Sequence, residues 1–367
     1  MSMKVLWYMN GPSPYRIDFL NHLNELMDLT VLIDNEKIQK RDERYFYNKN
    51  NNFNNYNLNK FSYFKLRKIL KNNYDIIVIQ HYAVFNAALL IMMLNNRKIP
   101  FIINADGGFV RENESFLSKF LKRFFISKAT EYITTSDISK QYLIYYGAKN
   151  KKILKYRFSS LKKEDILNKP WSYSEKLKIR KKMGYDYKRL FISVGSFIHR
   201  KAYDIFLRSI KSLDYDDVGF IVVGGGPLKN EYLKYINDNN IKNVYFIDFM
   251  EKKELFEYLK MSDVFFFPSR EDIWGLVINE AMACGLPVIS SDNVISSQEL
   301  LDRKYIYECN DINKQRQLIE LFINLSEKKL YDIGVNNLKT IKQYNTTDMA
   351  IEHKQIFEEV IYERNNK

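Results

Sequence analysis

Short apolar runs alternate with longer amphipathic segments along most of this chain. The runs are rich in Val, Ile and aromatic residues, and in the second half they lie roughly 20–30 residues apart. Strands that alternate with helical patterns are typical of parallel sheets covered by helices, so the pattern predicts a doubly wound α/β architecture. The predicted strands are 4–9, 29–33, 75–79, 101–104, 132–134 and 152–154 in the first half, and 190–194, 219–223, 244–247, 264–267 and 287–290 in the second.

The two sets of strands predict two domains. A chain of 367 residues exceeds the size at which a single core usually stops growing, about 250–300 residues. A charged stretch at 159–171 is the expected linker, so we place the domains at 1–168 and 169–345, followed by a last helix within 346–367. The Asn-rich segment 48–59 is expected to be an exposed loop.

The most informative segment runs from 264 to 290. It leaves a strand, enters a polar loop and a short helix, and stops at Gly285 before the next strand. Asp272 and Glu280 lie eight positions apart and bracket the helix start at Gly275. The unpaired N–H groups and the positive dipole end of that first turn favour an anion. This element therefore predicts a phosphate site flanked by two carboxylates that can bind sugar hydroxyls.

The same stretch resembles the E-x7-E motif of retaining family 4 glycosyltransferases. The likeness extends to the residues at 274–277 (Trp-Gly-Leu-Val) and 280–283 (Glu-Ala-Met-Ala). The resemblance implies the GT-B fold, two facing Rossmann-like doubly wound domains with a cleft between them, and a last helix that crosses back to the first domain. It also implies that Asp272, shorter than the usual Glu, contacts the transferred sugar and that Glu280 binds the donor ribose. Glu271 is an alternative to Asp272 that breaks the spacing.

The strand at 190–194 leads into a second stretch similar to that family. Lys201 stands where the family has a lysine for the donor diphosphate, and Ser196 replaces the usual arginine. Arg200 could restore the second charge, although adjacent residues need not point the same way. A fixed cation suits this place because the diphosphate gains negative charge as it leaves. The Gly-rich turn at 224–226 lacks the continuation that a nicotinamide site requires, which disfavours an oxidoreductase.

Three positions in the first half are candidates for the rest of the site. Gly11 corresponds to the family's loop near the diphosphate. Many members of the family have His-Asp at the positions of Ala105 and Asp106, so this chain keeps the aspartate and lacks the histidine. Asp106 would position or deprotonate the acceptor hydroxyl. The alternative is that Asp106 is a turn residue. His81 is a further candidate at a strand end, where a lone His is more often structural.

These assignments give a full candidate site. The expected catalytic residues are Asp106, Asp272 and Lys201, and the acceptor candidates are His81 and Asp106. The expected donor-binding residues are Gly11, Gly195, Arg200, Lys201, Phe249, Met250, Asp272, Gly275, Leu276, Val277 and Glu280. No metal or other cofactor is expected, because the sequence shows no convincing metal-ligand pattern; the UDP- or GDP-linked sugar is a substrate.

Charge separates the two halves. Residues 1–170 hold 28 Lys and Arg against 15 Asp and Glu, whereas the remainder holds 29 of each. A basic half favours an anionic partner. Nucleic acid is not expected, because no binding motif accompanies the charge. The segments 61–71 and 116–125 mix aromatics and cations at helical spacing, which favours an anionic membrane surface or packing on the domain's own sheet, and the two can coexist at different faces.

The expected location is cytoplasmic, with peripheral attachment to the inner face of the membrane. Cys284 and Cys309 have neither the number for a disulfide framework nor the spacing of metal ligands. The sequence shows no signal-peptide pattern, and no apolar stretch reaches the roughly 20 residues that a transmembrane helix needs.

We therefore expect a retaining glycosyltransferase that moves a sugar from a nucleotide donor to a glycan or polyprenyl-linked acceptor in bacterial surface polysaccharide synthesis. The alternatives are a nucleotide-sugar epimerase of the same shape and a non-catalytic sugar- or membrane-binding relic.

Overall fold

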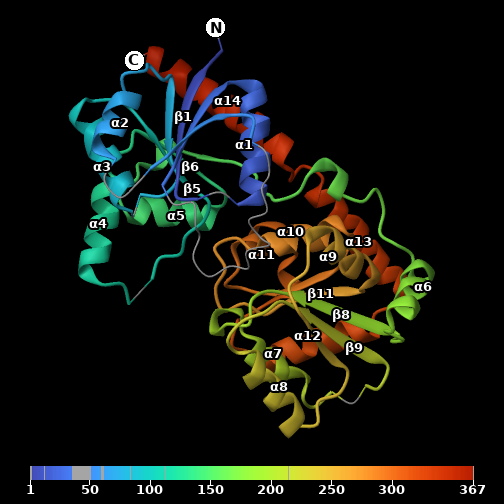
Figure 1. Ribbon diagram of the computed structural model, residues 1–367. Coiled ribbons are helices and arrows are strands. Elements are labelled where there is room, and N and C mark those ends of the chain that lie inside the picture. Colours follow the sequence, from blue (N-terminus) through green and yellow to red (C-terminus); the bar gives the residue numbers. More distant parts are fainter. Residues whose placement is uncertain are drawn as a thin grey trace. The chain divides into compact units, whose positions relative to one another are not determined.

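The computed structural model describes residues 2–11, 13–34, 51–58, 62–82, 84–111, 113–213 and 215–366. The chain divides into two compact units, residues 1–160 with 344–367 and residues 161–343 (Figure 1). Each unit is built on one parallel sheet.

The first unit contains a seven-stranded sheet of order β3-β2-β1-β4-β5-β6-β7. Five of its strands, from β1 to β6 without β3, are buried almost throughout, which explains their nearly continuous apolar sequences. The strands are β1 (Lys4–Met9), β2 (Asp28–Ile33), β3 (Asn54–Asn57), β4 (Ile76–Ile79), β5 (Ile102–Ala105), β6 (Glu131–Thr134) and β7 (Ile153–Lys155).

Helices cover both faces of this sheet. The chain steps one way from β1 to β2 and the opposite way from β3 to β7, so right-handed crossovers place α1 on one face and α2 to α5 on the other. The last helix, α14, packs against α1. The helices are α1 (Pro14–Leu26), α2 (Tyr63–Ile69), α3 (Phe85–Asn96), α4 (Phe116–Ile126), α5 (Asp137–Tyr145) and α14 (Thr346–Asn365).

The prediction of a loop at 48–59 is wrong for residues 54–57. Residues 54–57 form β3, which pairs with β2, while residues 48–50 and 59 lie outside the described part of the chain. All four residues of β3 are exposed. An edge strand with little buried surface carries no apolar pattern, so its sequence resembled a loop.

The second unit contains a six-stranded sheet of order β10-β9-β8-β11-β12-β13, also parallel. The two sheets and their helices confirm the predicted class of two Rossmann-like domains. The strands are β8 (Arg189–Val194), β9 (Val218–Val223), β10 (Val244–Ile247), β11 (Val264–Phe267), β12 (Val288–Ser291) and β13 (Ile306–Tyr307). The helices are α6 (Tyr173–Met183), α7 (Tyr203–Ile210), α8 (Lys229–Asp238), α9 (Lys252–Met261), α10 (Leu276–Ala283), α11 (Ile295–Leu300), α12 (Ile312–Asn324) and α13 (Glu327–Ile341).

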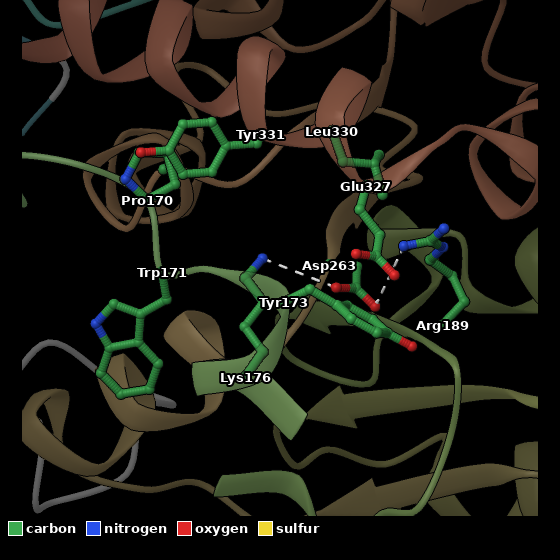
Figure 2. A pocket seen from close by; sticks show the side chains of 10 residues that line it. Pro170, Trp171, Tyr173, Lys176, Arg189, Asp263, Glu327, Leu330 and Tyr331 are labelled. Atoms are coloured by element: carbon green, nitrogen blue, oxygen red, sulfur yellow. Dashed lines mark ion pairs between the residues drawn. The ribbon is translucent and has the colours of Figure 1, made fainter. Parts of the chain in front are cut away.

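A buried ion cluster lies at the amino-terminal edge of this second sheet (Figure 2). Asp263, just before β11, is 2.6 Å from Arg180 and 3.8 Å from Lys176, both on α6, and 3.9 Å from Arg189, which begins β8. All four residues are buried. The cluster therefore fastens α6 to the two central strands, at the edge opposite the loops described below.

Candidate functional site

The candidate donor residues of the second unit lie on loops that leave the carboxyl ends of its strands. Open α/β sheets bind ligands at this edge. Gly195 to Lys201 follow β8, Phe249 and Met250 follow β10, and Asp272 to Gly275 follow β11. The fold thus brings to one sheet edge residues that are up to 80 positions apart in the sequence, from Gly195 to Gly275.

Lys201 and Asp272 form an ion pair at this edge. Lys201 Nζ lies 2.6 Å from Asp272 Oδ2, and the two side chains are only 11% and 14% exposed. The lysine also lies 4.4 Å from the ring centroid of Phe267. Burial alone would raise the pKa of Asp272, but the charge and hydrogen bond of Lys201 outweigh it and the pKa is lowered. Asp272 is therefore held as a carboxylate.

Arg200 points to the same carboxylate. Its NH1 atom is 3.4 Å from Asp272 Oδ2 and donates to the carbonyl of Glu271 at 2.5 Å. The two cations end a short 3-10 turn, His199–Lys201. Arg270, on the loop after β11, donates hydrogen bonds to the carbonyl oxygens of His199 and Arg200 and so holds this turn against its own loop. Adjacent residues on this turn thus converge on one point, which sequence spacing alone could not decide.

The start of α10 follows directly. Gly275 is its N-cap residue with φ +90°, and a Cβ there would lie 2.8 Å from Val294 Cγ1, so glycine fits this left-handed position best. The first-turn amides of Leu276 and Val277 have no partner within the helix. Trp274 N–H donates to Asp272 Oδ1 at 3.3 Å, which ties the carboxylate to the entry of the helix.

The remaining donor candidates of this unit lie on segments that follow β8, β10 and β11. Glu280 is half-buried one turn into α10, Phe249 is half-buried and Met250 is buried. Gly195 closes β8, and a Cβ on it would lie 3.4 Å from the Lys201 side chain. The same Cβ would lie only 3.0 Å from the hydroxyl of Tyr203, so a side chain at Gly195 would crowd that residue.

The first unit has a polar cluster around Asp106, at the carboxyl end of β5. Arg16 forms an ion pair with Asp106, and Gln80 Nε2 and Tyr156 OH donate to its carboxylate at 2.6 Å each. Burial alone would raise the pKa of Asp106, but the charge of Arg16 and the hydrogen bonds outweigh it and the pKa is lowered. Three side chains from different segments therefore bind the carboxylate of Asp106.

His81 and Gly11 lie at the same edge of the first sheet. β4 and β5 are neighbours with Ile79 opposite Ile103, so His81 lies level with Ala105 and next to Asp106 along the sheet. His81 interacts electrostatically with Asp106. Gly11 follows β1, the strand beside β4, and is half-exposed.

Sequence reasoning missed the partners of Asp106. Arg16 has a side chain only 7% exposed, on a face of α1 that it shares with buried Leu20 and Leu23. A cation at an apolar-face position was the available signal, because such a charge needs a buried counter-ion. Gln80 and Tyr156 carried no comparable signal.

Among the described residues, no group of three or more His, Cys, Asp or Glu is arranged to hold a metal ion. Likewise, no helix described here is long and apolar enough to cross a membrane.

Two family models match this chain. Glycosyl transferases group 1 matches residues 175–339, and Glycosyltransferase Family 4 matches residues 9–154. The donor candidates of the second unit lie in the first match, and Gly11, His81 and Asp106 lie in the second.

Curated relatives and solved structures are distant. An uncharacterized glycosyltransferase of Methanocaldococcus jannaschii is 28% identical over 65% of this chain and 61% of its own length. The O-antigen biosynthesis glycosyltransferase WclY of Escherichia coli is 25% identical over 47% of each chain. A structure of Anabaena HepE in complex with UDP has a TM-score of 0.79 at 16% identity, over 97% of this chain and 100% of the other. Such likeness at low identity shows the fold.

Proposed function

The chain belongs to the group 1, family 4 glycosyltransferases and has their GT-B fold, and from this premise we propose that it transfers a sugar from a nucleoside diphosphate donor to a hydroxyl with retention at the anomeric carbon. Donor binding is assigned to residues 169–345 and acceptor binding to residues 1–168, with the last helix, 346–367, completing the first domain.

One observation carries the proposal: two cations and a helix start meet at Asp272. Lys201 and Arg200 lie within 2.6 and 3.4 Å of the same carboxylate oxygen. A diphosphate beside them would be neutralised by both, with the amides of Leu276 and Val277 as further donors. Arg200 thus supplies the positive charge that the family's arginine would have at position 196. Asp272 contacts the transferred sugar, and Glu280 binds the ribose of the donor. Gly195, Gly11 and Gly275 leave room for the donor, and Phe249 and Met250 border the base, uracil or guanine.

In the transfer step the bond between the anomeric carbon and the diphosphate breaks. The nucleoside diphosphate leaves with the electron pair, and the acceptor oxygen forms the new bond on the same face of the sugar. The acceptor proton passes to the departing phosphate. Lys201 and the start of α10 stabilise the charge that develops on the leaving group. Asp106 and His81 orient the acceptor hydroxyl.

The acceptor is proposed to be a glycan or polyprenyl-linked intermediate of bacterial surface polysaccharide synthesis. The relationship to an O-antigen glycosyltransferase and the basic first half support this choice. The basic half would bring the enzyme to an anionic membrane from the cytoplasmic side. Both cysteines, Cys284 and Cys309, are buried free thiols, which suits a reducing compartment.

The test is incubation of the protein with a panel of UDP- and GDP-sugars, with and without a lipid extract, while free nucleoside diphosphate is measured. Release from one donor, increased by lipid extract, is expected. Interconversion of sugars without release would show an epimerase, and no reaction with any donor would favour a binding relic.

A matched pair of variants locates the donor. Glu280→Ala should abolish binding of the active donor, whereas Glu254→Ala, an exposed position on α9, should leave it unchanged. Wild-type affinity in Glu280→Ala would contradict the ribose assignment.

A further inference from the structure

Helix α4 turns its apolar face outward. Phe116, Leu117, Phe120 and Leu121 are 85%, 66%, 55% and 42% exposed, and Ile126 is the helix's one buried residue. A surface helix normally buries its apolar face against the domain. Packing on the domain's own core is seen for Phe125, which is partly buried against it, but not for Phe116 and Phe120.

The exposed side chains form one continuous surface. Positions 116, 117, 120, 121 and 124 share a side of an α-helix by their spacing. Phe120 stacks on Phe124 with ring centroids 6.3 Å apart. Four large, neighbouring and exposed apolar side chains indicate an interaction surface rather than chance exposure.

Cations border this surface. Arg123 is exposed, and Lys128, just beyond the helix, lies 5.0 Å from the ring centroid of Phe124. Lys119 and Lys122, on the same helix, contact Tyr145 and Tyr146 at the end of α5 and so lie on another side of it. Glu114, a described acid just before the helix, is paired with Lys122. The rim is therefore positive, as expected of a helix that lies on an anionic lipid surface.

A second helix in the same layer has the same character. α2 and α4 cover the same face of the first sheet, because both belong to the crossovers that run from β3 to β7. Phe64 on α2 is 80% exposed and has Arg67 and Lys68, both exposed, on the same helix. Residue 61 of the predicted segment 61–71 lies outside the described residues.

We propose that α4 lies in the headgroup region of an anionic bilayer and inserts Phe116, Leu117, Phe120 and Leu121 among the acyl chains. This inference rests on the membrane partner of the proposed function and specifies the surface that contacts it. A second copy of the chain is a poorer occupant, because pairing two such surfaces would bring their positive rims together. Figure 1 shows α4 at the periphery of the first unit.

The experiment is co-sedimentation of the full chain with vesicles of phosphatidylglycerol and phosphatidylethanolamine, compared with phosphatidylcholine alone. Binding is expected to the anionic vesicles and to weaken with salt. Phe120→Ser/Leu121→Ser should lower the partition coefficient on the order of tenfold or more, because two exposed side chains no longer enter the apolar layer. Leu233→Ser/Leu321→Ser, at exposed positions of α8 and α12, is the matched control and should bind as the wild type does.

Charge and insertion are tested separately. Arg123→Gln/Lys128→Gln should weaken binding, whereas Lys181→Gln/Lys182→Gln, on the exposed side of α6, should not. In Phe120→Trp, fluorescence should be quenched by lipids brominated on the acyl chain, above the level seen with wild-type tryptophans. Far-UV circular dichroism and thermal unfolding verify that each variant is folded.

Three outcomes would overturn the proposal: no binding of the wild type to anionic vesicles, binding unaffected by Phe120→Ser/Leu121→Ser, or concentration-dependent dimers that the same variant abolishes. The assay needs no sugar nucleotide, so its failure is distinct from a failure of donor chemistry.

Discussion

Replacing Lys201 by methionine tests the proposed donor site through both stability and chemistry. The lysine shares a 2.6 Å ion pair with Asp272, and both side chains are largely buried. Removing one partner of a fully buried pair costs about 3–5 kcal/mol, because the other charge is left without compensation. Arg200 at 3.4 Å and the Trp274 amide retain part of the compensation. We therefore expect the free energy of unfolding to fall by about 2 kcal/mol.

The second variant separates the two effects. In Lys201→Met/Asp272→Asn the uncompensated charge is gone, so most of the lost stability should return. Activity should not return, because the diphosphate still lacks its cation. Loss of one preorganised charge-stabilising group typically lowers turnover about 10²- to 10³-fold, and we expect that loss in nucleoside diphosphate release with both variants.

The assays are chemical denaturation for stability and nucleoside diphosphate release for activity. Lys304→Met is the matched control: its 2.7 Å pair with Asp302 has a similar length but is more than half exposed. That variant should lose little stability, because water screens the exposed pair, and it should retain full activity. If Lys201→Met stayed within threefold of wild-type turnover with the active donor, the assignment of the diphosphate to this lysine would be refuted.

Three further predictions concern other parts of the chain. Gly224→Ala should destabilise the second unit by at least about 2 kcal/mol and reduce donor binding, because its Cβ would lie 2.0 Å from a carbonyl oxygen of the loop after β8. Gly225→Ala is the control: a Cβ there meets open space, so the variant should behave as the wild type does. Thermal unfolding and nucleotide titration check both variants. Arg16→Met should cost about 3 kcal/mol at pH 7, because the buried carboxylate of Asp106 loses its counter-ion. Without Arg16 the burial that raises the pKa of Asp106 is no longer outweighed, so the carboxyl group is neutralised more readily as the pH falls and the loss of stability should shrink. Denaturation between pH 3 and 7 tests this. Burial and the neighbouring arginines lower the pKa of Lys176 to about 8 despite Asp263. Between about pH 8 and 10.5 the folded protein therefore binds fewer protons at this residue than the unfolded chain does, so the free energy of unfolding should rise with pH across that window. In Lys176→Met, the slope of the free energy of unfolding against pH should be flatter.

The architecture could be predicted because buried parallel strands have continuous apolar sequences. The three strands 4–9, 244–247 and 264–267 were predicted with the bounds that the structure has. β13, of two residues, and the exposed edge strand β3 bury too little surface to leave such a pattern. Sequence pattern therefore identifies the central strands of a sheet more easily than its edges.

The candidate site divides in the same way. Residues on a single contiguous element, such as Asp272 and Gly275, could be placed from spacing alone. The direction of Arg200 depends on a turn tied to another loop, and the donors to Asp106 come from three distant segments. The outward orientation of α4 was also undetermined, because an amphipathic pattern gives the faces of a helix but not which of them meets the domain.

The electrostatics of the two candidate carboxylates bear on where the acceptor proton goes. Asp106 and Asp272 both have lowered pKa values, one because of Arg16 and its hydrogen bonds, the other because of Lys201. A general base works best with a pKa near the operating pH, and stabilising the ionised form of a carboxylate weakens it as a base. Neither is therefore tuned to deprotonate a hydroxyl, and both are suited to orient one. On the proposed mechanism the departing diphosphate lies on the same face of the sugar as the incoming hydroxyl, gains negative charge as the bond breaks, and needs no tuned side chain to accept the proton.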